Sequence, residues 1–299
     1  MSVIVGGHET GLLDSSLALL NRNDRTANNE LGQGEQSFVN VSNGNLLIQQ
    51  QDAFLPSLGE DYSLVRTYNV RGRASDAGQH EDARWTFSTT TRLNERNDGG
   101  ERHFEVEFGD GSFFDYYLDP DSGLFVSTDG AGAFSTIEDL GTNGNTEPSF
   151  ILTRADQTRL SFDSQGRLLQ LEDTNGVTVD YIYASDRLQQ VIDDQGHVLN
   201  YIYQNGVLFQ VTDESEGVLV EYRYESGRLS EVIDRFGHST KYFYTNNGFL
   251  ERIELPNEQI VDGQLETYDN REISFVYDTV NWRGDNRATA QVVTKPTLN

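Results

Sequence analysis

The 299-residue sequence contains no cysteine, which excludes disulfide bonds and zinc sites built from thiolates. Basic residues are also few: 22 Lys and Arg stand against 48 Asp and Glu, giving a formal net charge of −26. Such a chain repels nucleic acids and anionic membrane surfaces, so we expect neither as a partner. No stretch approaches the ~20 apolar residues of a membrane-spanning helix. The chain is nevertheless long enough for one large or two ordinary domains, each with a buried core.

The first residues show no export signal, because they lack both the basic start and the clean apolar run of a signal peptide. One side of a short helix could be lined by four leucines: Leu12, Leu13, Leu17 and Leu20. Residues 21–36 are polar, with almost nothing to bury. We therefore predict a flexible leader at 1–35, and any export must use a signal that this chain does not display.

Glycine and aromatic residues are abundant, with 28 Gly, 14 Tyr and 16 Phe against only 5 Pro. Glycine turns between aromatic-rich runs indicate an all-β fold. From residue 36 onwards, short strand-like runs recur, including hairpins around 42–44 and 109–111 and an alternating strand at 85–93. We predict a smaller β-sandwich or barrel-like domain at 36–148. It is followed by an array of sequence repeats at 149–299.

That array contains a glycine-to-tyrosine unit four times, as GVTVDYIY, GHVLNYIY, GVLVEYRY and GHSTKYFY. The first tyrosines of these units set a period of 20 or 21 residues, which is typical of arrays of small supersecondary units. Between the tyrosine pairs runs a second element that contains leucine, valine and aspartate. The residues that define the repeat are Gly176, Gly196, Gly217 and Gly237; Tyr181, Tyr183, Tyr201, Tyr203, Tyr222, Tyr224, Tyr242 and Tyr244; Leu188, Leu208 and Leu229; and Asp193, Asp213 and Asp234.

Each unit is predicted to be one antiparallel β-hairpin. Val179, Tyr181 and Tyr183 share one face of the outgoing strand, since side chains alternate along a strand. Leu188 and Val191 on the return strand are three residues apart rather than two, which predicts a β-bulge or strong local twist in each unit. A single hairpin cannot bury its aromatic face, so neighbouring hairpins must stack side by side with their tyrosines in rows.

These residues resemble the RHS or YD-repeat family, whose unit combines Gly, Tyr-x-Tyr, Gly-Arg-Leu, Val and Asp in this order. The resemblance covers about residues 149–255, and residues 41–69 resemble the segment that precedes the repeats in such proteins. It implies a hairpin ribbon that spirals into a hollow shell, of which this chain is the amino-terminal part. It also implies a bacterial protein that is secreted or on the cell surface, with a longer polypeptide or an encapsulated toxin domain as partner.

One segment superficially resembles the aspartate–proline segment linked to self-cleavage in that family. It lies at 116–127, before the repeats rather than after them, and Asp129 is followed by Gly130 instead of proline. We therefore expect an ordinary β-hairpin there and no cleavage.

The repeats present cannot enclose a folded protein. Each hairpin advances the ribbon by about 9.6 Å, so five or six hairpins extend over roughly 50–60 Å. A cargo of ~130 residues needs a girth above roughly 110 Å. The array therefore forms about half of one turn of the spiral. This predicts part of the wall of a shell and not a closed shell.

No residue set predicts catalysis, a cofactor or a metal ion. The aspartates of successive units are roughly 10 Å apart, too far to share an ion, and Asp before a glycine turn usually binds its own backbone. His197 and His238 are ~19 Å apart by the same count. The acidic residues at 110–121 lack a calcium-loop motif, and the Arg-Gly-Asp at 283–285 is short enough to arise by chance.

Two functions from different classes stay open at this point. The first is a non-enzymatic structural scaffold, the opening section of a YD-repeat shell. The second is a binding module in which a tyrosine-lined concave sheet recognises a carbohydrate or a cell-surface protein. Burial of the tyrosines separates the two, because rings that are mostly below ~10% exposed leave no face for a sugar.

Overall fold

The computed structural model describes residues 17–19, 35–40, 45–55, 62–70, 84–128, 132–142, 146–256, 258–261, 264–267, 269–278 and 289–297. They fall into two compact units. Unit 1 is formed mainly by Phe87–Asn200, and unit 2 by Leu17–Ala53, Val65–Thr86 and Tyr201–Asn299. Each unit takes segments from both sides of position 148/149, and the division into 1–35, 36–148 and 149–299 stays a prediction.

The described elements are antiparallel β-strands apart from one 3-10 turn at Ser88–Thr90, which confirms the predicted all-β fold of hairpin repeats. The predicted hairpin around 42–44 is confirmed by the pairing of Val39 with Leu46. The hairpin around 109–111 is confirmed by the pairing of Glu107 with Phe113.

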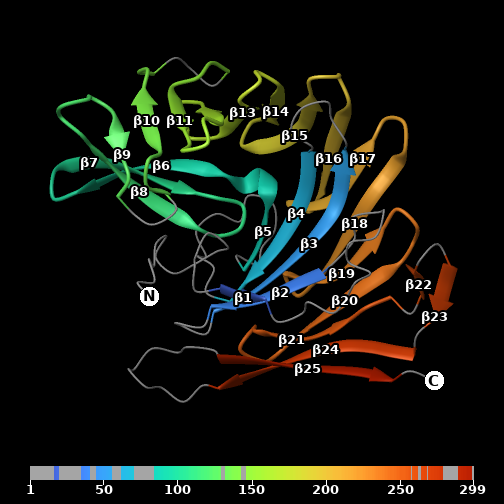
Figure 1. The fold of residues 1–299 in the computed structure, drawn as a ribbon. Coiled ribbons are helices and arrows are strands. Elements are labelled where there is room, and N and C mark those ends of the chain that lie inside the picture. Colours follow the sequence, from blue (N-terminus) through green and yellow to red (C-terminus); the bar gives the residue numbers. More distant parts are fainter. Residues whose placement is uncertain are drawn as a thin grey trace. The chain divides into compact units, whose positions relative to one another are not determined.

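Unit 1 contains one ladder in which each strand pairs antiparallel with the next along the chain (Figure 1). The strands expected in a separate domain before the repeats continue directly into the repeat hairpins within this ladder. Its strands are β6 (Arg92–Asp98), β7 (Glu101–Glu107), β8 (Phe113–Leu118), β9 (Phe125–Val126), β10 (Thr136–Asp139), β11 (Phe150–Thr153), β12 (Arg159–Phe162), β13 (Leu168–Glu172), β14 (Thr178–Ala184), β15 (Arg187–Asp193) and the first residues of β16 (Val198–Gln204).

Unit 2 contains later repeat hairpins and a second, five-stranded sheet. The repeat strands are β17 (Val207–Asp213), β18 (Gly217–Glu225), β19 (Arg228–Asp234), β20 (Ser239–Tyr244), β21 (Leu250–Glu254), β24 (Asp269–Asp278) and β25 (Thr289–Thr297), with the small hairpin β22 (Glu258–Val261) and β23 (Gln264–Thr267). The five-stranded sheet has the order β1 (Leu17–Leu19), β2 (Glu35–Asn40), β3 (Leu46–Leu55), β4 (Tyr62–Asn69) and β5 (Trp85–Phe87).

The return strands contain the predicted bulges. Ile182 lies opposite Gln190, whereas the next residue, Tyr183, lies opposite Leu188, so the return strand has one extra residue here. The same shift occurs in the hairpins β18–β19 and β20–β21. The extra residue returns the side chains to the same face, which explains why Leu188 and Val191 are both buried although they are three positions apart.

The face opposite the buried tyrosines has its own repeating contact. At successive junctions between hairpins, a glutamine amide donates a hydrogen bond to the facing side chain on the next strand. The pairs are Gln170 with Asp180 (2.7 Å), Gln190 with Asn200 (2.9 Å) and Gln210 with Glu221 (3.0 Å). Each pair joins one hairpin to the following one, so these contacts are made between neighbours in the sequence.

Two local predictions are wrong. The strand expected over 85–93 is interrupted at Ser88–Thr90, where the Thr90 hydroxyl donates to the Phe87 carbonyl (2.7 Å) and competes with strand pairing. The helix expected from four leucines is contradicted at Leu17–Leu19, which pairs with β2 and so satisfies its backbone in a sheet. Positions 12, 13 and 20 of that expectation lie outside the described residues.

Candidate functional site

The predicted repeat residues form buried rows within each unit. The first tyrosine of every pair is enclosed, and the second is partly buried. Exposed fractions of the first tyrosines are 6% for Tyr181, 3% for Tyr201, 1% for Tyr222 and 3% for Tyr242. The second tyrosines are Tyr183, Tyr203, Tyr224 and Tyr244. The return-strand leucines Leu188, Leu208 and Leu229 are buried as well.

The repeat aspartates close the turns between hairpins. The Asp193 carboxylate accepts hydrogen bonds from the backbone N–H groups of Gln195 (2.9 Å) and His197 (2.8 Å). Asp213 and Asp234 bind their own turns in the same way. The His197 and His238 rings each contact the aspartate of their own turn, through Nδ1 at 2.8 and 2.9 Å. These carboxylates are therefore engaged within their turns.

The repeat glycines belong to the same turns. Gly176, Gly196, Gly217 and Gly237 all have positive φ, between 78° and 84°. A Cβ added at any of them would meet no atom within 4 Å. Their requirement for glycine thus comes from backbone conformation and not from close packing.

A repeated arginine covers the second tyrosine of the following hairpin. The guanidinium of Arg167 lies 5.1 Å from the ring centre of Tyr183, and that of Arg228 lies 5.7 Å from Tyr244. These are cation–π distances. The equivalent position before Tyr224 is Val207, so this hairpin has no arginine of its own there.

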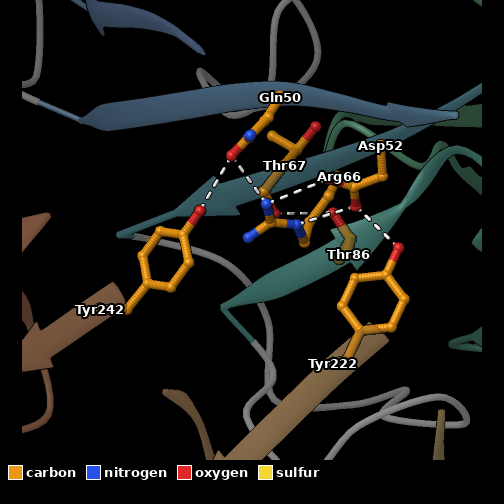
Figure 2. A network of polar contacts seen from close by, with 7 residues as sticks. All are labelled: Gln50, Asp52, Arg66, Thr67, Thr86, Tyr222 and Tyr242. Carbon is orange, nitrogen blue, oxygen red and sulfur yellow. Dashed lines mark hydrogen bonds and ion pairs between the residues drawn. The ribbon is translucent and has the colours of Figure 1, made fainter. Parts of the chain in front are cut away.

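Unit 2 also contains an arginine cluster, defined as Gln50, Asp52, Arg66, Trp85, Tyr222 and Tyr242. Arg66 is 0% exposed and donates to Asp52 through Nε (3.0 Å) and Nη2 (3.1 Å) and to Gln50 Oε1 through Nη2 (2.8 Å). Figure 2 shows the hydroxyls of Tyr222 and Tyr242 reaching the same two acceptors from the repeat strands, at 2.8 Å from Asp52 and 2.9 Å from Gln50. The cluster therefore joins β3 and β4 to β18 and β20.

Aromatic rings complete the surroundings of this arginine. The Arg66 guanidinium lies 4.7 Å from the Trp85 ring centre and 5.1 Å from that of Tyr242. Burial by itself would lower the pKa of Arg66, but the Asp52 carboxylate, Tyr242 and Tyr222 together outweigh burial, and the pKa is raised well above its usual value. For Tyr222 burial acts in the opposite direction and raises the pKa, because it disfavours the charged phenolate. The cluster is thus an ion pair enclosed by rings, with the phenol protonated.

Sequence reasoning missed this cluster. Its members come from positions 50 to 242, so no local spacing connects them. The available signal was an arginine inside the otherwise strand-like run at 63–69, together with Gln50 and Asp52 on one face of the preceding strand. Charged residues are rarely fully buried unless they are paired, so such an arginine calls for a buried acid.

A hollow of about 900 Å³ lies along the repeat strands of unit 2. In its lining, Arg223 donates to Glu231 (2.7 Å), and the same guanidinium donates to Glu221 (2.8 Å). The residues lining it are Gln204, Asn205, Val207, Phe209, Tyr222, Arg223, Tyr224, Glu225, Gly227, Ser230, Glu231, Lys241, Tyr242 and Phe243. We assign no chemistry to it.

Among the described residues, no three His, Asp or Glu side chains are grouped so that they could hold a metal ion. In the acidic stretch at 110–121, Asp119 accepts a hydrogen bond from the Ser122 hydroxyl (2.6 Å), and this bond lowers the Asp119 pKa. The described part of the chain likewise contains no helix of the length and apolar character that a membrane crossing requires.

Tyr116 in unit 1 makes the stability pH-dependent in the alkaline range. The side chain is 1% exposed, and burial raises its pKa from 10.0 to about 12. The unfolded chain therefore loses this proton first, so the stabilisation is complete below pH 10.0 and is lost as the pH rises towards 12. We expect the free energy of unfolding to fall in this window by up to about 1.4 kcal/mol per pH unit from this group.

Urea unfolding at a series of pH values measures this slope. The variant Tyr116→Phe has no proton to lose and is expected to show a shallower decline between pH 10.0 and 12. An unchanged slope in the variant would contradict the assignment.

Comparison with known protein families finds one match within the hairpin array. Residues 162–198 match the family model of the RHS repeat. No curated protein matches the chain. Among solved structures, a crystal structure of TcdB2-TccC3 is similar at a TM-score of 0.32 and 11% sequence identity, over 87% of this chain and 17% of that chain. The family-model match alone places an RHS repeat within the hairpin array, at residues 162–198.

Proposed function

We propose that the chain is a non-enzymatic structural scaffold, the opening section of a YD-repeat shell of an exported toxin or cell-surface protein. The observation that carries this proposal is the use of the repeated side chains. The first tyrosines and the leucines are buried in the core. The aspartates and glycines form the turns between the hairpins. The repeat-defining residues thus have structural roles in this proposal.

The RHS match at 162–198 supports the same role, because it lies in the hairpins that supply these rows. In this proposal the partner is the remainder of a longer polypeptide or an encapsulated toxin domain. The protein acts outside a bacterial cell or on its surface. The net charge of −26 suits this setting, since it favours solubility and disfavours binding to nucleic acid.

Carbohydrate binding by the tyrosine rows has less support. A sugar stacks on an exposed aromatic face. The first tyrosines are at most 6% exposed, which leaves only the partly buried second tyrosines for such contacts. We therefore do not propose this role.

The scaffold proposal is tested on the full polypeptide that contains this chain. Leu208 is completely buried, so Leu208→Asn removes apolar packing and places an amide in the core, at a cost of several kcal/mol. We expect limited proteolysis to leave the polypeptide downstream of the repeats intact in the wild type and to cleave it in this variant.

The matched control is Ile202→Asn, because Ile202 lies in the preceding strand but is 41% exposed. This variant should retain the wild-type cleavage pattern. Equal protection in Leu208→Asn and the wild type, or turnover of a substrate by the purified chain, would count against the scaffold.

A further inference from the structure

Asparagine followed by glycine can close into a ring, because glycine has no Cβ to obstruct the attack of its backbone nitrogen on the asparagine side chain. The chain contains this pair five times, beginning at Asn43, Asn143, Asn175, Asn205 and Asn247. The first two pairs lie outside the described residues. The structure separates the other three by the hydrogen bonds that their reacting groups make.

Two of the described pairs have their glycine amide engaged. Gly176 N–H donates to the carbonyl oxygen of Asp173 (3.1 Å), and Gly248 N–H donates to that of Thr245 (2.9 Å). The side-chain amide of Asn175 also donates to the Asp173 carboxylate (3.2 Å). In both pairs a hydrogen bond must therefore break before the glycine nitrogen can attack.

Asn205 and Gly206 form a loop of a different kind. They are the two residues between β16, which ends at Gln204, and β17, which begins at Val207. In a two-residue hairpin loop the flanking residues complete the ladder, and the amides of the two central residues stay outside it. Both residues are exposed, and within the described part of the chain neither the Gly206 N–H nor the Asn205 side chain makes a hydrogen bond.

We propose that Asn205 is a site of spontaneous deamidation and the first of the three described asparagines to react. The Gly206 nitrogen gives its proton to solvent and bonds to the side-chain carbonyl carbon of Asn205. The bond from that carbon to the amide nitrogen breaks, and the nitrogen leaves with a proton as ammonia. Water, the only co-reactant, then opens the succinimide ring at either carbonyl and yields aspartate or isoaspartate.

Both products alter this hairpin. Each replaces a neutral amide by a carboxylate and so adds a negative charge to a chain of net charge −26. Isoaspartate also lengthens the backbone of the loop by one methylene, and a loop of two residues has no slack to absorb it without disturbing the adjacent strand pairing. The ends of β16 and β17 next to the loop therefore loosen as the protein ages.

The test is incubation of the full chain in mildly alkaline buffer, with peptide mapping by mass spectrometry at intervals. We expect conversion at Asn205 to be about tenfold faster than at Asn175 or Asn247, because a hydrogen bond must first break at those two positions. Equal rates at the three positions, or faster conversion at either of the other two, would overturn the proposal.

The matched control is Asn205→Ser, because the next hairpin loop already has serine in this place: φ is 52° at both Asn205 and Ser226. The variant should keep the fold and show no conversion in this loop. Amide hydrogen exchange at the adjoining ends of β16 and β17 should become at least about threefold faster on ageing in the wild type and stay unchanged in Asn205→Ser. The same acceleration in the aged variant would refute the proposed loosening by deamidation.

Discussion

Replacing Asp52 by asparagine is expected to lower the free energy of unfolding of the protein by about 3–5 kcal/mol. Asparagine keeps the shape of the side chain but removes the charge that neutralises Arg66, which is 0% exposed. The Tyr222 hydroxyl also loses its charged acceptor. Urea unfolding measures the loss, and the fluorescence of Trp85 reports on the cluster because its ring lies 4.7 Å from the guanidinium.

The control for this variant is the double replacement Asp52→Asn/Arg66→Met. Exchanging both members of a buried ion pair for uncharged groups of similar volume is often neutral. We expect the double variant to be clearly more stable than Asp52→Asn alone. If the two are equally unstable, the cost comes from lost packing, and the charge argument for the cluster fails.

Gly166→Ala is expected to be the most damaging glycine replacement in the described turns of unit 1, at about 4 kcal/mol or more. Gly166 has a φ of 74°, and a Cβ there would lie 1.7 Å from the carbonyl oxygen of Leu93. The same residues are joined by a hydrogen bond from Leu93 N–H to Gly166 O (2.9 Å). The methyl group can be accommodated only if the turn separates from β6, which breaks that bond.

Gly176→Ala is the matched control, since Gly176 has a φ of 83° in the same kind of turn but meets no atom within 4 Å. Its cost should be about 1–2 kcal/mol, from the left-handed backbone alone. Thermal unfolding of both variants gives the comparison. Equal losses would show that contact with Leu93 contributes nothing to the effect.

The repeats could be predicted from the sequence because their determinants are local. Glycine and aspartate fix the turn within four residues, as in Asp193 and Gly196, and the three-residue spacing of Leu188 and Val191 reveals the bulge. Alternation along one strand then gives the buried face. These signals recur at each period, so each hairpin supports the interpretation of the others.

What could not be predicted depends on contacts distant in the chain. The arginine cluster joins Asp52 to Tyr222, 170 positions apart, and nothing near either residue indicates the other. The break after Phe87 combines a local and a distant contact: the Thr90 hydroxyl donates to the Phe87 carbonyl oxygen, and Gly109 packs so closely there that a Cβ would lie 2.3 Å from the same oxygen.

The glutamine pairs on the face opposite the buried tyrosines, such as Gln190 with Asn200, have a consequence for how the number of repeats can evolve. Each pair links a hairpin only to its neighbour. A duplication or deletion of one 20- or 21-residue period would therefore leave every remaining hairpin with an equivalent neighbour. Recombination within the gene that adds or removes whole units would therefore keep these contacts between neighbouring hairpins.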